Sequence, residues 1–300
     1  MKSKQTYSEL ALVIVTIIWG LGFPITKLAF NYGFDAYMIM VGRFATATIL
    51  LTIIFRRKLK FINKEVVIFG VITGLFLFLG FLFQTLGNGI TTPSKNGFIT
   101  QLNIVFVPFL YFLFFKKKVD LYNIISVVVA TIGLYVLSFG FDTISLENIN
   151  LGDFFTFICA IMVAFNIITG SYFQKKHDLD PATFVLFNIY TATLFSVIAM
   201  FIFSKPIDIK ILEYWPLLFL GVLNTAIGFL VQSYALKYSL PTRVSLIVVL
   251  ESVFAAIGSV LIVNEVLTES VVIGGLLIIA GVLITEIKPF NKLTKDIEMN

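Results

Sequence analysis

The sequence predicts an all-α integral membrane protein of ten transmembrane helices, arranged as two inverted five-helix repeats. Three observations predict this fold: an apolar composition, ten apolar runs long enough to span a bilayer, and an internal similarity between the two halves. We expect residues 1–140 to form the first repeat and residues 141–300 to form the second, which includes a short cytoplasmic tail.

The composition excludes most soluble classes of protein. Hydrophobic residues make up 58% of the 300 residues and charged residues 13%, whereas roughly a quarter of a soluble domain is charged. Such a chain is also the opposite of a polar, disordered one. The single cysteine, Cys159, excludes a disulfide framework, and the single histidine, His177, argues against a histidine metal site. We therefore expect no cofactor and no metal.

Ten runs of roughly 20 mostly apolar residues follow one another, and this is the length that a helix needs to cross a bilayer. The first run is too long for a removable signal peptide. The runs fill most of the chain, so we expect no soluble domain. They cover residues 9–30, 36–55, 66–87, 94–115, 121–140, 152–173, 181–203, 214–236, 242–263 and 270–287.

Polar, glycine or proline positions separate these runs, since such residues favour loops over membrane helices. From the second run to the ninth, the breaks are Arg56-Arg57-Lys58, Thr92-Pro93, Lys116-Lys117-Lys118, the segment from Asp142 to Asn150, Lys175-Lys176-His177, Lys205-Pro206, Pro241 and Asn264-Glu265.

The basic residues predict the orientation, because lysine and arginine resist translocation. If the N-terminus is cytoplasmic, the basic clusters at residues 56–64, 116–118 and 175–176 all fall on the cytoplasmic side. Membrane topology thus explains the net charge of +5, and we expect no nucleic-acid partner. The prediction is a multi-pass protein of a bacterial inner membrane with both termini in the cytoplasm.

The second half of the chain repeats the first. A shift of 148 residues brings Gly80-Phe81-Leu82-Phe83-Gln84 onto Gly228-Phe229-Leu230-Val231-Gln232 and Pro93-Ser94-Lys95 onto Pro241-Thr242-Arg243. Near the start of each half the shift is slightly smaller, and Asp35 aligns with Asp180. Each repeat holds an odd number of spans, so the second must enter the membrane from the opposite side. Inverted repeats are typical of secondary transporters, in which a site between the halves opens alternately to either side.

Several motifs resemble the EamA-type branch of the drug/metabolite transporter superfamily. They are Trp19-Gly20 with Lys27 in the first run, Arg43-Phe44 in the second, and Leu250-Glu251-Ser252-Val253-Phe254 in the ninth. The resemblance covers residues 9–287 and implies ten helices, a central cavity, and export or exchange of small metabolites, often amino acids. The chain departs from the family pattern where Ser252-Val253 replaces a frequent proline and where lysines 116–118 replace an acidic residue.

Charged residues inside a membrane run are costly and are therefore candidates for function. Glu251 lies about ten residues into the ninth run. It either binds a proton or a substrate amine and couples transport, or it satisfies helix ends or an arginine. Arg43 binds a substrate carboxylate, pairs with Glu251, or ties helices together through backbone carbonyls. Lys27 snorkels to the rim or ends an aromatic row with Trp19 and Phe23 at helical spacing.

Polar residues on membrane helices must face protein or water rather than lipid. They either line a substrate cavity or join helices by hydrogen bonds. The candidates are Gln84, Asn88, Asn166, Asn188, Asn224 and Gln232. Lys95 and Arg243 follow the prolines that begin the fourth and ninth runs, and we expect them to anchor helix ends at opposite rims.

The sequence lacks the motifs of ATP-driven pumps, zinc proteases and serine hydrolases. It contains no GxxxxGK[ST] phosphate loop, no HExxH and no GxSxG. We expect a secondary transporter, not an enzyme, that works as a monomer or homodimer, with protons as a candidate coupling ion. Amino-acid export is the leading function because of the family resemblance. The alternatives are exchange of sugar phosphates or nucleotide sugars, and a lipid-handling enzyme or scaffold.

Overall fold

A computed structural model describes residues 2–117, 119, 121–139, 150–204, 211–266 and 268–287. These residues form helices and connecting turns without any strand. The predicted boundary between the repeats, the end of the 116–118 lysine cluster, the Lys205-Pro206 break and the tail after residue 287 lie outside the described residues.

The helices follow the predicted runs closely. In chain order they are α1 (Lys2–Asn31), α2 (Ala36–Phe55), η1 (Lys58–Phe61), α3 (Lys64–Ile90), α4 (Pro93–Gln101), α5 (Asn103–Phe115), α6 (Leu121–Phe139), α7 (Leu151–Lys176), α8 (Pro181–Phe203), η3 (Ile211–Tyr214), α9 (Trp215–Phe219), η4 (Leu220–Ile227), α10 (Gly228–Tyr238), α11 (Pro241–Val248), α12 (Leu250–Val263) and α13 (Glu269–Ile287).

These helices make ten membrane-spanning segments in the described part of the chain. Eight stretches are long and apolar enough to cross a bilayer, and two shorter apolar helices lie within α6 and α13. Large apolar side chains such as Phe201 and Leu261 are exposed on the outer surface of the bundle. Lipid is the environment that accommodates such a surface, so the ten-helix membrane fold is confirmed.

Three segments differ from the uninterrupted helices that the sequence predicts. The fourth span breaks at Leu102 between α4 and α5, and the ninth breaks at Val249 between α11 and α12. Side chains compete for backbone carbonyls there, because Asn103 donates to the carbonyl of Thr100 and Ser252 to that of Val249. The eighth span contains the π-helix η4, and wide turns of this kind occur frequently at functional sites.

Corresponding elements of the two halves have the same local structure. Both α4 and α11 begin with a proline, and both α2 and α8 are capped by an aspartate side chain, Asp35 or Asp180. Lys116 ends α5 at φ 56°, and Asn264 ends α12 at φ 57°. These two left-handed caps are related by the 148-residue shift, so the repeat extends to backbone conformation.

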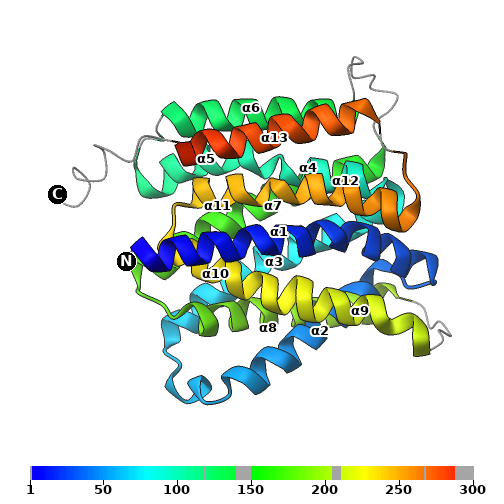
Figure 1. Cartoon of the computed structure of the whole chain (residues 1–300). Coiled ribbons are helices and arrows are strands. Elements are labelled where there is room, and N and C mark those ends of the chain that lie inside the picture. Colours follow the sequence, from blue (N-terminus) through cyan, green and yellow to red (C-terminus); the bar gives the residue numbers. More distant parts are fainter. Residues whose placement is uncertain are drawn as a thin grey trace.

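The two halves pack together with an approximate two-fold arrangement. α6 packs beside α13 along one edge of the bundle, and α2 packs beside α8 towards the opposite edge (Figure 1). The contacts of α1 with α11 and α12 have their counterparts in the contacts of α7 with α4 and α5. We call the end where α1 begins the proximal end, and the end where α1 finishes the distal end. α13 also finishes at the proximal end (Figure 1).

Candidate functional site

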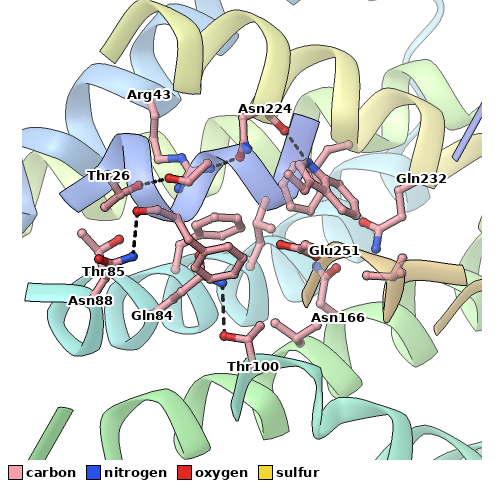
Figure 2. A pocket seen from close by; sticks show the side chains of 18 of the residues that line it. Thr26, Arg43, Gln84, Thr85, Asn88, Thr100, Asn166, Asn224, Gln232 and Glu251 are labelled. Atoms are coloured by element: carbon pink, nitrogen blue, oxygen red, sulfur yellow. Dashed lines mark hydrogen bonds between the residues drawn. The ribbon is translucent and has the colours of Figure 1, made fainter. Parts of the chain in front are cut away.

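A cavity of about 680 Å³ lies between the two halves in the middle of the bundle (Figure 2). Both repeats contribute to its wall, which mixes aromatic rings, amides and hydroxyls with two charged side chains. The lining residues are Trp19, Gly22, Phe23, Thr26, Arg43, Phe76, Leu77, Phe81, Gln84, Thr85, Asn88, Thr100, Gln101, Val163, Asn166, Asn224, Phe229, Gln232, Val248 and Glu251.

Arg43 on α2 reaches across the cavity to the π-helix η4 of the other repeat. Its Nη2 donates to Asn224 Oδ1 at 2.6 Å, and its Nε donates to Thr225 Oγ1 at 3.1 Å. Its guanidinium also lies 4.0 Å from the ring centre of Phe81. No ion pair joins Arg43 to Glu251 among the described residues. The guanidinium is thus held by hydrogen bonds and by an aromatic face at the wall of the cavity.

Asn224 is fixed from a second side by α1. Trp19 Nε1 donates to the backbone carbonyl of Asn224 at 2.6 Å, and Asn224 Nδ2 donates to the carbonyl of Ile18 at 3.1 Å. Two glycines make this approach possible. A Cβ at Gly228 would lie 2.3 Å from Trp19 Nε1, and one at Gly22 would lie 2.3 Å from Asn224 Nδ2. The sequence therefore needs glycine at both positions to bring the helices this close.

Glu251 lies in the first turn of α12, directly after the break in the ninth span. It accepts a hydrogen bond from Gln101 Nε2 at 2.8 Å, and Gln101 Oε1 accepts one from Asn103 Nδ2 at 3.2 Å. Gln101 and Asn103 flank the equivalent break in the fourth span. The two breaks thus bring an acid of one repeat and an amide of the other together in the bundle interior, where Glu251 is 8% exposed.

The remaining amides form a polar layer around the cavity. Gln84 donates to Thr100 Oγ1 at 3.4 Å, Asn88 to the carbonyl of Phe23 at 3.2 Å, and Asn166 to the carbonyl of Thr73 at 3.1 Å. Within the described residues, the buried Asn88 Oδ1 and Thr85 Oγ1 have no hydrogen-bond partner. Buried polar atoms are normally satisfied, so these two atoms are available to a solute or to water in the cavity.

A second, smaller cavity of about 270 Å³ lies towards the proximal end. It shares Leu77, Asn166, Phe229 and Gln232 with the central cavity, so the two are adjacent. Asn188 lines this smaller cavity. Every other cavity candidate taken from the sequence lines the central one: Trp19, Phe23, Arg43, Gln84, Asn88, Asn166, Asn224, Gln232 and Glu251.

The three predicted rim residues bind backbone or acidic partners near the bundle ends. Lys27 Nζ donates to the carbonyls of Asn88, Gly89 and Thr91 at 3.1–3.3 Å. Lys95 forms an ion pair with Asp153 at 2.6 Å. Arg243 forms one with Glu9 at 3.1 Å.

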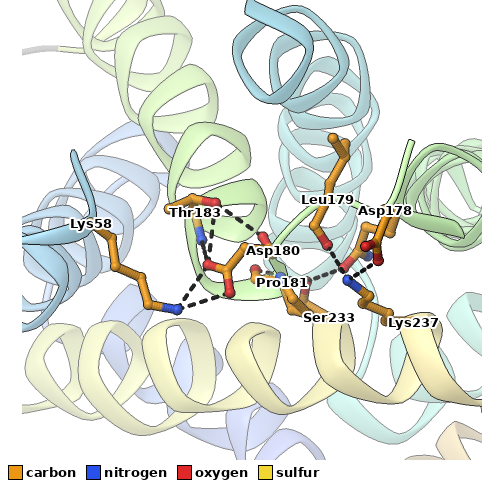
Figure 3. A network of polar contacts seen from close by, with 9 residues as sticks. Lys58, Asp178, Leu179, Asp180, Pro181, Thr183, Ser233 and Lys237 are labelled. Carbon is orange, nitrogen blue, oxygen red and sulfur yellow. Dashed lines mark hydrogen bonds and ion pairs between the residues drawn. The ribbon is translucent and has the colours of Figure 1, made fainter. Parts of the chain in front are cut away.

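A further polar network joins α8 and α10 to the loop before α8 at the proximal end (Figure 3). Lys58 pairs with Asp180 at 2.8 Å, and Lys237 pairs with Asp178 at 2.8 Å. The hydrogen bond and charge of Lys237 lower the pKa of Asp178. Partial burial acts to raise the pKa of Asp180, but hydrogen bonds from Lys58 and Thr183 outweigh it and the net shift is downward.

Sequence reasoning missed the acids Glu9 and Asp153 and the hydroxyl partners Thr225 and Thr91. Glu9 and Asp153 lie 144 residues apart, close to the smaller shift of 145 that relates Asp35 to Asp180, so an alignment that allows a one-residue gap would pair them. Thr225 offers no such signal, because its role depends on the wide turn of η4. Among the described residues, no three His, Cys, Asp or Glu side chains gather as a metal site would require.

Comparison with known proteins gives consistent results. The model of the EamA-like transporter family matches residues 6–139 and again residues 150–287. An uncharacterized transporter of Archaeoglobus fulgidus is 27% identical over 95% of this chain and 87% of its own length. The uncharacterized transporter YoaV of Bacillus subtilis is 24% identical over 91% of this chain and 94% of its own.

One solved crystal structure shares the fold. It superposes with a TM-score of 0.70 at 14% identity, covering 91% of this chain and 96% of the other.

Proposed function

The chain belongs to the EamA-like transporter family, and from this premise we propose that it moves a small amphipathic metabolite across the membrane by alternating access. The observation that carries the proposal is the central cavity, which is lined by residues of both repeats in the middle of the bundle.

An amino acid or a related compound is the substrate class that the wall of the cavity favours. Arg43 and Glu251 are the two charged side chains among its lining residues, and they carry opposite charges. A zwitterion offers a carboxylate to the guanidinium and an ammonium group to the carboxylate, as charge-assisted hydrogen bonds require. The rings of Trp19, Phe23 and Phe229 then face the apolar part of the solute.

Exchange of phosphorylated sugars receives less support. A dianionic phosphate needs several converging cations, and Arg43 is the one cation in the wall of the central cavity. Lys27 and Lys95 lie near the distal end, where they bind carbonyls and Asp153. The other alternative, a lipid-handling enzyme, would convert its substrate into a chemical product. The counterflow experiment described below would detect such a product.

The remaining parts of the proposal concern sidedness and coupling. We place the protein in a bacterial inner membrane with both termini cytoplasmic, since the basic clusters then lie on the cytoplasmic side. The proximal end is then cytoplasmic. Protons are the proposed coupling ion, and Glu251 is the group that binds them.

Counterflow in proteoliposomes tests the function. Vesicles loaded with one unlabelled amino acid are mixed with trace labelled amino acid, across a panel that also contains a sugar phosphate. We expect accumulation of at least one amino acid without chemical change. Arg43→Gln should reduce its rate at least tenfold, since a charged hydrogen bond contributes about 1.5–3 kcal/mol.

The matched control is Glu65→Gln, because Glu65 is half-exposed on the surface and distant in sequence from every cavity residue on α3. Folding of each variant is verified by its thermal midpoint. Absence of counterflow for every amino acid, with intact protein, would refute amino-acid transport. Conversion of a lipid or solute into a product would replace the carrier proposal by an enzymatic one.

A further inference from the structure

Two acidic residues at opposite ends of the bundle each bind the turn between two consecutive helices, which we call a corner. We infer that Asp153 and Glu9 are gating residues: each holds one mouth of the transport path closed, and each is released when that mouth opens. This inference rests on the proposed transport function and adds two positioning residues to it.

At the distal end, Asp153 binds both sides of the corner between α3 and α4. Its Oδ2 accepts from Lys95 Nζ at 2.6 Å, and its Oδ1 accepts from Thr91 Oγ1 at 2.8 Å. Asp153 itself is 5% exposed, and it sits in the first turn of α7 within a capping box formed with Asn150. The acid therefore belongs to a rigid helix start, and the corner that it holds belongs to the other repeat.

At the proximal end, Glu9 binds the corner between α10 and α11 in the same manner. It accepts a hydrogen bond from Ser239 Oγ and forms an ion pair with Arg243 Nε at 3.1 Å. Glu9 is 8% exposed. Here the acid belongs to the first repeat, and the corner belongs to the second.

The two corners are images of each other under the internal repeat, and the acids that bind them lie 144 residues apart. The 148-residue shift carries Thr91 onto Ser239 and Lys95 onto Arg243, which are the hydroxyl and the cation of the two corners. Since the repeats are inverted, these equivalent corners lie at opposite ends of the bundle. The structure therefore contains the same cross-repeat contact twice, once at each mouth.

Each corner is also bound by hydrogen bonds from another helix of its own repeat. On the distal side, Lys27 of α1 binds the carbonyls at the end of α3. On the proximal side, Ser171 and Lys175 of α7 bind the carbonyls of Leu236 and Ser239 at the end of α10. These ties keep each corner with its own repeat when it separates from the opposite one, as rigid-body rocking requires. On the distal side, the separation also breaks the hydrogen bond from Ser94 to Glu265 of the second repeat.

Movement of these corners would change access to the cavities. The end of α3 carries Thr85 and Asn88 of the central cavity, and the end of α10 carries Ser233 and Leu236 of the smaller one. With both contacts formed, Thr85 is 1% exposed and Ser233 is 5% exposed. Both side chains are therefore shielded while the two contacts are formed, and breaking one contact should increase access to one of them alone.

Cysteine accessibility tests this inference without knowledge of the substrate. Thr85→Cys and Ser233→Cys are repeat-related reporters, introduced singly in a Cys159→Ala background. A membrane-impermeant thiol reagent is added to either side of oriented vesicles. We expect Asp153→Asn to speed labelling of the Thr85→Cys reporter roughly tenfold from the distal side, as loss of one charged hydrogen bond allows, with no change at Ser233→Cys.

Glu9→Gln should have the opposite effect: it should speed labelling of the Ser233→Cys reporter from the proximal side and leave labelling of Thr85→Cys unchanged. Asp180→Asn is the matched control, since its ion pair with Lys58 also joins the two repeats at the proximal end but lies 42–44% exposed and outside both corners. Exchanging the charges in Lys95→Asp with Asp153→Lys re-forms the ion pair with reversed polarity and should restore slow labelling. The side-specific labelling of the single variants is the result that a purely structural role of Asp153 would not predict.

Unchanged labelling in both variants, or equal changes at both reporters, would overturn the inference. The outcomes also separate it from the transport proposal. If labelling shifts as expected but no solute is carried, the gates stand and the proposed function fails. If counterflow occurs while labelling never shifts, the transport proposal stands and the gating roles of Asp153 and Glu9 are refuted.

Discussion

Replacing Arg43 by lysine tests whether the guanidinium, rather than its charge, holds the central site together. Lysine keeps the positive charge but cannot donate to both Thr225 and Asn224 in the geometry of the arginine fork. The substitution also removes a planar cation from the face of Phe81, 4.0 Å away. The contact between α2 and the π-helix η4 should therefore weaken while the charge of the cavity stays the same.

The expected loss follows from these contacts. One hydrogen bond from a charged group contributes about 1.5–3 kcal/mol, and a desolvated cation–π contact adds about 2 kcal/mol, of which lysine recovers a part. We expect Arg43→Lys to destabilise the protein by roughly 3 kcal/mol, which corresponds to a fall of about 6 °C in the thermal midpoint. Counterflow should fall at least tenfold, because η4 carries Asn224 into the cavity wall.

The measurement is thermal unfolding in detergent together with counterflow in proteoliposomes. Arg57→Lys is the matched control, since Arg57 is exposed in the turn after α2 and the same chemical change there should alter neither quantity. A thermal midpoint and a flux for Arg43→Lys equal to those of the Arg57→Lys control would refute the reasoning. It would show that a positive charge alone suffices at this position.

Three further outcomes follow from the structure. Glu251→Gln keeps the shape of the side chain beside Gln101 but removes its charge, so proton-driven uptake into vesicles should be lost, and unchanged uptake with an unchanged pH profile would remove Glu251 from coupling. Gly133→Ala should lower the stability of the folded protein by about 1–3 kcal/mol through overpacking, because the new Cβ would lie 2.8 Å from backbone atoms of Gly274 and Ile278. Gly275→Ala is the control in the same thermal unfolding assay, since its Cβ would meet Val253 at an ordinary 3.6 Å. The pKa of Asp180 is lowered in the folded protein, so its contribution to stability is present above the ordinary aspartate pKa and is lost as the pH falls below about 4. Unfolding curves of Asp180→Asn, measured at several pH values, should lack this acid-dependent loss. Identical pH profiles for the variant and the unmodified protein would contradict the prediction.

Much of the fold could be predicted because the bilayer imposes simple rules. A helix that crosses lipid must be apolar over about 20 residues and must satisfy its own backbone hydrogen bonds. All ten runs therefore appeared as spans with small differences at their ends. The helical start of α1 at Lys2 was not predicted, since residues 2–8 are polar and carry no signal of a membrane run.

The interruptions of the helices escaped prediction for a physical reason. The breaks at Leu102 and Val249 arise where Asn103 and Ser252 bind nearby carbonyls. The same residue types occur elsewhere within unbroken membrane helices, for example Asn166 in α7. Whether such a side chain interrupts a helix depends on what packs against it, which a local pattern does not contain.

By itself, the sequence determined that the chain is a ten-helix membrane protein built from a duplicated, inverted unit, and it indicated which polar residues face inward. These properties follow from hydropathy and repetition, both of which are local or periodic. Only the tertiary structure decided which polar groups meet. Arg43 binds Thr225 rather than Glu251, Glu251 binds Gln101, and the acids Glu9 and Asp153 find cations far away in the chain. Hydrogen bonds and ion pairs act over a few ångströms, so their partners are set by how the helices pack and not by the order of residues along them.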